Sequence, residues 1–250
     1  MSLQPRFSVG LAVGILLAGV ASVNADDKFG AALKLDHFKF YKVEPASTKA
    51  DASVKGQFDR DSVSVSLPEI TMFANPVSKD GGRLINPQAH LAWYKLLQRL
   101  AEPRRAVEFE NQFGRQEALL GKPVALLVPT EKVEDGSKFP EGLDHFKVYE
   151  VLEALPRRKT VTLKDQFGAE EGVNIGKAMF FAVPVMKKHG DRVTKIVNEK
   201  AHLTIYGLRP PKPYKLTKQT TDQFGKHKLS VIDSALLALP TVKIAWKAID

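Results

Sequence analysis

The sequence predicts an all-β protein with two similar antiparallel β-sandwich or barrel-like domains, built from four three-strand units of about 55 residues. Three observations lead to this fold class. The same short words recur four times at near-constant spacing, apolar residues alternate with a period of two, and apolar runs are followed by turn-forming residues. The hydrophobic content of 44% is that of an ordinary globular protein, so a packed core is expected.

The first 25 residues have the layout of a secretory signal peptide. A single positive charge, Arg6, precedes an uncharged apolar run over residues 7–20, and the small residues Val23 and Ala25 precede a cleavage point. The run is about 14 residues long, whereas a membrane-spanning helix needs roughly 20. An uncleaved anchor is the alternative. We expect export to the periplasm or the exterior, with no membrane span in the mature chain.

Composition narrows the chemistry. The chain has no cysteine, which excludes disulfides, thiolate nucleophiles and cysteine-ligated metals. The sequence contains no phosphate-binding loop, nucleophile elbow, zinc-protease or calcium-loop pattern. The net charge of +9 favours polyanionic partners, although such a charge also keeps proteins soluble. We therefore expect no cofactor and no enzymatic activity, and as partner an anionic envelope polymer or another envelope protein rather than nucleic acid.

The repeat is defined by three markers in constant order. Each unit opens with a histidine that a tyrosine follows four residues later, as in LDHFKFYKV and LDHFKVYEV. The motif GQFD, NQFG or DQFG follows, with its glutamine 20–22 residues after the histidine. A proline stands 17–19 residues after that glutamine. The histidines that open units 1 to 4 are His37, His90, His145 and His202. Such regularity indicates one building block used four times.

Within a unit, alternation predicts the first strand. In unit 3, residues 145–151 place His145 and Tyr149 on one face and Phe146 and Val148 on the other. The β-branched stretch KTVTLKDQF predicts a second strand and GAEEG a turn. The apolar run VNIGKAMFFAVPV predicts a buried third strand that its proline ends.

Turn residues complete the unit. The glycine after QF in three units allows positive φ, and Asp59, which replaces it in unit 1, tolerates that conformation better than most residues. The tips SKDGGR and KKHGDR predict hairpin turns. AHLAWYKLLQRLAEP is the one stretch whose pattern allows a helical turn.

The domain boundaries follow from two flavours of unit. Units 1 and 3 open with DHF and units 2 and 4 with AHL, so the chain is a duplicated pair. The polar segment 131–142, EKVEDGSKFPEG, predicts a linker or long loop. We expect one domain over residues 31–130 and a second over 143–250. A four-bladed propeller is the alternative, but its blades normally carry four strands.

Residues present in every unit are expected to shape the fold, because a functional site is needed once and should break the repeat. The competing hypothesis is an exported metal-binding protein or metal-dependent enzyme that uses the repeated histidines, since imidazole is a common ligand. Its metal ligands would be His37, His90, His145 and His202. The alternative is a structural role, in which the ring of each histidine forms a hydrogen bond with a neighbouring backbone group.

The candidate ligand-binding residues belong to loops that differ between units. If these loops share one end of the molecule, they form a basic rim for phosphate or carboxylate groups; scattered solvated loops are the alternative. The residues are Arg104, Arg105, Arg157, Arg158, Lys159, Lys212, Tyr214 and Lys215. Trp93 and Trp246 are candidate stacking platforms for a sugar or base, with core packing as the alternative for Trp93.

The combination of DHFK-x-Y, DQFG and P-x-AHL-x-x-Y resembles a family of duplicated domains in exported bacterial proteins whose function is unknown. The resemblance covers most of the mature chain and implies export and a β-rich scaffold, with no catalytic residue to transfer. Family members often carry a cysteine before the tyrosine; here Phe40, Trp93, Val148 and Ile205 stand there, which implies apolar packing in place of sulfur cross-links.

Overall fold

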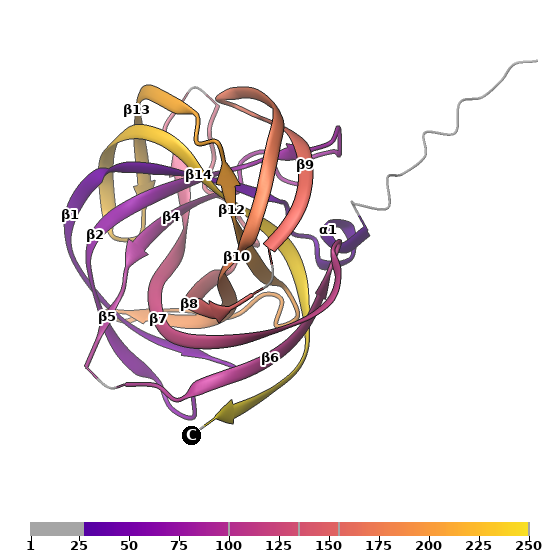
Figure 1. The fold of residues 1–250 in the computed structure, drawn as a ribbon. Helices are drawn as coiled ribbons and strands as arrows, with labels where there is room; N and C mark the ends of the chain where they lie inside the picture. The colour runs from indigo at the N-terminus through magenta and orange to yellow at the C-terminus, as the bar shows by residue number, and fades with distance from the viewer. Residues whose placement is uncertain (1–27, 100, 135, 155, 250) are drawn as a thin grey trace, which may run out of the picture.

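The computed structural model describes residues 28–99, 101–134, 136–154 and 156–249. The predicted signal peptide lies outside the described residues. Most of the described chain lies in strands of one antiparallel sheet, accompanied by one short helix, α1 (Lys28–Leu33) (Figure 1). The all-β, antiparallel fold class is confirmed. None of the described helical structure is long and apolar enough to cross a membrane.

The strands follow the four units. Units 1 and 2 contain β1 (Phe38–Gly56), β2 (Val63–Pro76), β3 (Ser78–Lys79), β4 (His90–Lys95), β5 (Leu97–Gln98), β6 (Arg104–Asn111) and β7 (Gly114–Lys132). Units 3 and 4 contain β8 (His145–Glu153), β9 (Pro156–Asp165), β10 (Gly168–His189), β11 (Arg192–Thr194), β12 (His202–Arg209), β13 (Pro213–Asp222) and β14 (Gly225–Ile249).

Eight of these strands close into a ring. The order is β1, β2, β4, β7, β8, β10, β12 and β14, and β14 pairs with β1 again. Each unit supplies two adjacent ring strands, one that starts at its histidine and one long strand that ends the unit. Closure pairs the backbone groups that an open sheet would leave at its edges.

The two sequence halves share this ring instead of forming separate cores. The predicted linker 131–142 connects β7 to β8, and these strands are neighbours, with Leu127 opposite Phe146. Phe38 in β1 lies opposite Ala238 in β14, where the first and last units meet. The reason is geometric: each half supplies only four of the eight ring strands, so neither closes alone.

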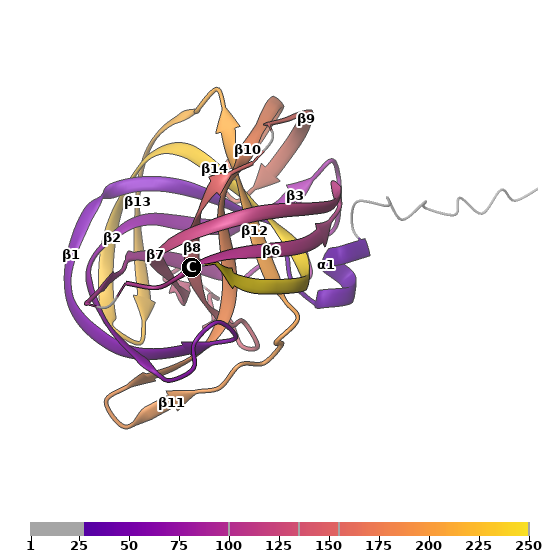
Figure 2. The same cartoon turned by 60° about the horizontal axis from the view of Figure 1, so that its bottom comes forward.

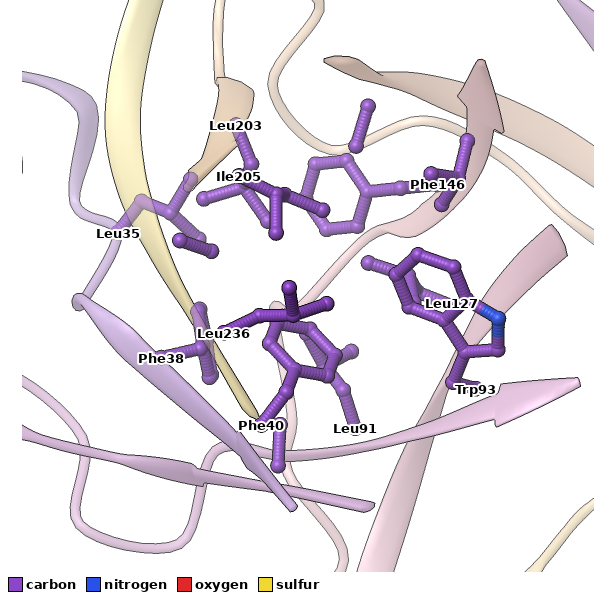
Figure 3. Close-up of a cluster of buried hydrophobic side chains, with 14 of the residues drawn as sticks. Leu35, Phe38, Phe40, Leu91, Trp93, Leu127, Phe146, Leu203, Ile205 and Leu236 are labelled. Carbon is purple, nitrogen blue, oxygen red and sulfur yellow. The ribbon is translucent and has the colours of Figure 1, made fainter. Parts of the chain in front are cut away.

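An apolar core fills the ring (Figure 3). It is built from the residues one and three places after each histidine, namely Phe38, Phe40, Leu91, Trp93, Phe146, Val148, Leu203 and Ile205. Trp93 packs edge-on against Phe40 at 5.6 Å and Phe180 at 5.1 Å between ring centroids. The core-packing interpretation of Trp93 is therefore confirmed.

The predicted strand end at the proline is confirmed in unit 1, where β2 ends at Pro76, and is wrong in units 2 to 4. β7, β10 and β14 continue beyond Pro129, Pro184 and Pro240. The proline marks a change of neighbour: β14 pairs with β12 up to Thr241 and with β6 from Val242 onward. A residue without an N–H is tolerated where one ladder gives way to another.

The turns also differ from the sequence pattern in part. GAEEG lies inside β10, and the hairpin turns at Gln166 and Phe167, where Asp165 pairs with Gly168. The glycine after QF has positive φ in all three units, as predicted, at 84°, 116° and 134° in units 2, 3 and 4. Asp59 does not adopt positive φ. The stretch expected to allow a helical turn contains β5 instead.

Candidate functional site

The repeated aromatic residues connect units across the ring. The phenylalanine of each QF turn packs against the tyrosine of the unit two places away, with ring centroids 4.9–5.4 Å apart. The pairs are Phe58–Tyr149, Phe113–Tyr206, Phe167–Tyr41 and Phe224–Tyr94. We call these four pairs the ring latches. Each ring latch therefore packs the QF turn of one unit against the first strand of the unit two places away.

A polar contact completes three of the latches. Tyr94 donates its hydroxyl to Asp222 at 2.6 Å, and Tyr41 donates to Asp165 at 2.5 Å. In the third, the Asn111 amide donates to the Tyr206 hydroxyl at 3.0 Å. Burial, followed by the charge of Asp222, raises the pKa of Tyr94, so its hydroxyl stays protonated and donates. In units 2, 3 and 4 the residue before the glutamine is thus a structural partner of a latch tyrosine.

A fourth marker of the repeat was missed by sequence reasoning. A lysine stands three residues after the proline in every unit: Lys79, Lys132, Lys187 and Lys243. Three of these ammonium groups lie 4.4–6.0 Å from the ring centroid of a latch phenylalanine. The constant spacing from the proline was the available signal. These lysines belong to the scaffold as well.

The repeated histidines do not converge. His90 stacks on Phe73 with ring centroids 5.5 Å apart, and His202 places Nδ1 3.0 Å from the Lys200 carbonyl. The His145 ring contacts the Gln223 side chain. Burial lowers the pKa of both His90 and His202 to about 4. Within the described ranges, no three His, Asp or Glu side chains form a group suited to a metal ion.

The aspartates before two of these histidines fasten loops. Asp36 accepts the N–H groups of Ile85 and Asn86 at 2.7 and 2.8 Å. Asp144 accepts those of Val197 and Asn198 at 2.6 and 2.9 Å. Each carboxylate holds the loop that leads into the next AHL strand. This explains why units 1 and 3 open with DHF and units 2 and 4 with AHL. The aspartate of the first unit in each pair holds the loop that precedes the first strand of the second unit.

Unit 1 departs from the latch pattern. It has Gly56 where other units carry Asp or Asn, and it moves the carboxylate to Asp59. Asp59 accepts the Gly56 N–H at 2.8 Å and pairs with the buried Lys147 ammonium at 2.9 Å. Glu102 reaches the same ammonium at 2.5 Å and accepts the Tyr149 hydroxyl at 3.2 Å. The break in the repeat therefore creates a buried ionic cluster.

The basic residues predicted as a rim have different surroundings. Arg105 is only 2% exposed and pairs with Glu102 at 2.8 Å, whereas Arg104 is exposed on β6. Lys159 is exposed beside the Phe113 ring. The side chains of Arg157 and Arg158 lie outside the described part of the structure.

The remaining rim candidates lie on or beside β13. Tyr214 donates its hydroxyl to Glu170 at 2.6 Å, and Glu170 also pairs with the buried Lys39 at 2.6 Å. Lys212 and Lys215 are exposed at the start of this strand. Tyr214 is thus part of a buried network, which could not be predicted from the sequence because Lys39 and Glu170 are 131 residues apart.

A groove of about 1510 Å³ lies where the repeat breaks. Its walls are the β1–β2 turn, the loop after β5 and the β10–β11 turn, and the side chains of Phe58, Asp59, Glu102 and Arg105 reach its lining from the ionic cluster. Four serines also line it: Ser53, Ser62, Ser64 and Ser66. Glu102 lies in the loop after β5 and Arg105 near the start of β6. The Arg104–Arg105 pair of unit 2 was a sequence signal for this site, and Arg105 is the one predicted residue with a described side chain that lines it.

Comparison with known proteins matches residues 90–240 to a family described as a repeat of unknown function (DUF7450). The match extends from the histidine of unit 2 to the proline of unit 4. No curated protein and no solved structure matches the chain.

Proposed function

We propose that this chain, which belongs to the DUF7450 family of repeats of unknown function, is an exported, non-catalytic binding protein that holds an anionic polymer of the cell envelope in its groove. The observation that carries this proposal is the position of the groove. It lies where unit 1 carries Gly56 and Asp59 in place of the Asp or Asn and the Gly of the other units, beside the loop that follows β5 in unit 2. A feature that serves recognition belongs where the units differ, because the shared residues are already engaged in the scaffold.

The exposed charges of the groove lining have a small excess of cations, three against two acids, which favours an acidic ligand. Three exposed cations line it: Arg60, Arg99 and Lys188. Of the two exposed acids in the same lining, Asp51 already accepts the Ser66 hydroxyl at 2.5 Å, and Asp61 is the other. Charge-assisted hydrogen bonds from guanidinium and ammonium groups suit carboxylates and phosphates.

The acids of the ionic cluster support a binding role over a catalytic one. Asp59 and Glu102 both contact the Lys147 ammonium, and Glu102 also pairs with Arg105. These cations, opposing burial, lower the pKa of Glu102. A carboxyl group held in its ionised form by two cations is a poor general acid.

Export rests on the N-terminal sequence pattern. A lone Arg6, an apolar run of about 14 residues and small residues at positions 23 and 25 fit a cleaved signal. N-terminal sequencing of protein recovered from the producing cell is the direct test, and a mature chain that starts near Asp26 is the expected result.

The groove is tested by binding polygalacturonate, a carboxylated polymer, to the purified protein. We expect affinity to fall steeply between 50 and 200 mM salt, because displaced counterions drive such binding. The combined change Arg60→Ala, Arg99→Ala and Lys188→Ala should weaken binding at least about tenfold, a loss of about 1.4 kcal/mol. Calorimetry or a sedimentation assay measures both effects.

A matched variant removes three charges elsewhere. Lys122, Lys164 and Lys228 are exposed and do not line the groove. Changing these three to alanine lowers the net charge equally and should leave the affinity within about twofold. If both triple variants weaken binding to the same degree, the positive charge acts over the whole surface and the groove is not the site.

A further inference from the structure

Trp246 is an exposed aromatic residue at a second place where the repeat breaks. It stands six residues after the unit 4 proline, where units 1 and 3 have the turn glycines Gly82 and Gly190. In unit 4 the chain continues instead as the last part of β14, paired with β6 (Figure 2). All five residues from Ile244 to Ala248 are exposed there, and the indole is 39% exposed.

The indole is braced from beneath. Its ring centroid lies 4.9 Å from that of Phe58, which in turn lies 5.4 Å from that of Tyr149. The Arg105 guanidinium lies over both Phe58 and Tyr149, at 5.1 and 5.3 Å from their centroids. A ring supported in this way loses little freedom when a ligand covers its open side, which favours binding.

The support also connects the indole to the groove. Phe58 contacts Trp246 and lines the groove, so the two features share one side chain. Lys243 and Arg105 lie on the same side of the sheet as Trp246, because both cations contact the Phe58 ring on which the indole packs, at 6.0 and 5.1 Å from its centroid. The nearby acid Glu108, opposite Ala245, is paired with Arg115. The surroundings of the indole are therefore basic, like the rim of the groove.

We propose that Trp246 is a stacking platform for a sugar ring of an acidic polysaccharide whose chain continues into the groove. This inference rests on the proposed function and names its ligand class. The flat face of an indole packs against the C–H groups of a pyranose ring, while groove cations and serine hydroxyls hold carboxylates and ring hydroxyls. Proteins that bind single-stranded nucleic acid place several aromatic platforms in a row. The described groove lining has four serines, and its aromatic rings are the buried Phe58 and the exposed imidazole of His189, so it has no row of large aromatic platforms, which favours a glycan.

The experiment uses the two tryptophans of the chain as its reporters. Trp93 is buried in the ring core at 5% exposure, so a ligand that covers the surface should change only the emission of Trp246. We expect polygalacturonate to shift the emission to shorter wavelength and to protect it from acrylamide quenching. Trp246→Phe should abolish the change in emission, and Trp246→Ala should weaken binding about tenfold by calorimetry.

Ile244→Ala is the control, since Ile244 is 41% exposed on the same strand. This variant should bind polygalacturonate with the affinity of the unmodified protein. Polyphosphate, which has charge but no sugar ring, should bind more weakly and leave the emission unchanged. Binding of polygalacturonate with unchanged emission and unchanged affinity in Trp246→Ala would overturn the platform while leaving the groove intact. Equal emission changes with polyphosphate or single-stranded DNA would overturn the sugar assignment. No binding of polygalacturonate at all would overturn both proposals.

Discussion

At the scale of single residues, repetition identifies structure. Histidine, tyrosine, glutamine and phenylalanine recur in all four units. The four histidines and four tyrosines are buried, each QF phenylalanine packs on one of these tyrosines, and the glutamines of units 1 and 3 donate to backbone carbonyls. The sequence was sufficient to assign these residues to the fold, because four copies in register indicate a shared structural need. It could not pair them, since Phe224 and Tyr94 are 130 positions apart and only the closed ring brings them together.

The ring latches differ in the charge of one partner, which allows a matched test. Tyr94 donates to the carboxylate of Asp222, whereas Tyr206 bonds to the neutral amide of Asn111. We expect Tyr94→Phe to lower the free energy of unfolding by about 1.5–3 kcal/mol, because it leaves a buried carboxylate with one donor fewer.

The comparison variant is Tyr206→Phe, for which about 0.5–1.5 kcal/mol is expected because its bond joins neutral groups. Urea denaturation of both proteins at neutral pH measures the two losses. An equal or larger loss in Tyr206→Phe would contradict the importance of the charged partner and would assign the stability of the latches to ring packing alone.

At the scale of elements, strands were predictable and their extents were not. Alternation correctly placed the first strand of each unit, because one face of that strand lines the core and the other packs against the phenylalanines of the QF turns. Proline ends the strand in unit 1 as predicted, at Pro76, but not in units 2 to 4. Its actual effect depends on which neighbours lie on either side, and a single strand's sequence does not contain that information.

Loops between elements are held by single carboxylates. Asp144 accepts two backbone N–H groups from the loop that precedes β12. Asp144→Asn should lower the free energy of unfolding by about 1–2 kcal/mol, because an amide has one acceptor oxygen and would set its NH₂ group against a backbone N–H.

The control is Asp191→Asn in the exposed β10–β11 turn, which should change stability by less than about 0.5 kcal/mol. Chemical denaturation monitored by tryptophan fluorescence compares the two. If Asp144→Asn proves as mild as Asp191→Asn, the loop is held mainly by Asn198, which also donates to the Leu33 carbonyl at 2.9 Å.

At the scale of the whole molecule, the duplicated pair does not correspond to two cores. The polar segment predicted at residues 131–142 begins in the last two residues of β7 and leads to β8. Composition does not tell whether such a connection separates two domains or joins neighbouring strands. The latches run between unit 1 and unit 3 and between unit 2 and unit 4, so every latch crosses this boundary.

This arrangement predicts that neither half folds alone. A fragment of residues 143–250 lacks four ring strands and the tyrosine partners of Phe167 and Phe224. Its amide resonances should be poorly dispersed and its thermal transition non-cooperative, and mixing with residues 31–142 should restore both. A half that gives a dispersed spectrum and a sharp transition by itself would show that it has a core of its own.

The pairing of β1 with β14 has a consequence for synthesis. These partners are separated by some 200 residues, since Phe38 lies opposite Ala238. Contacts so distant in sequence are slow to form, and an incomplete sheet offers unpaired backbone groups to other chains. The first strand can therefore pair with β14 only after the last residues have left the ribosome. Until then the nascent polypeptide depends on chaperones to prevent aggregation.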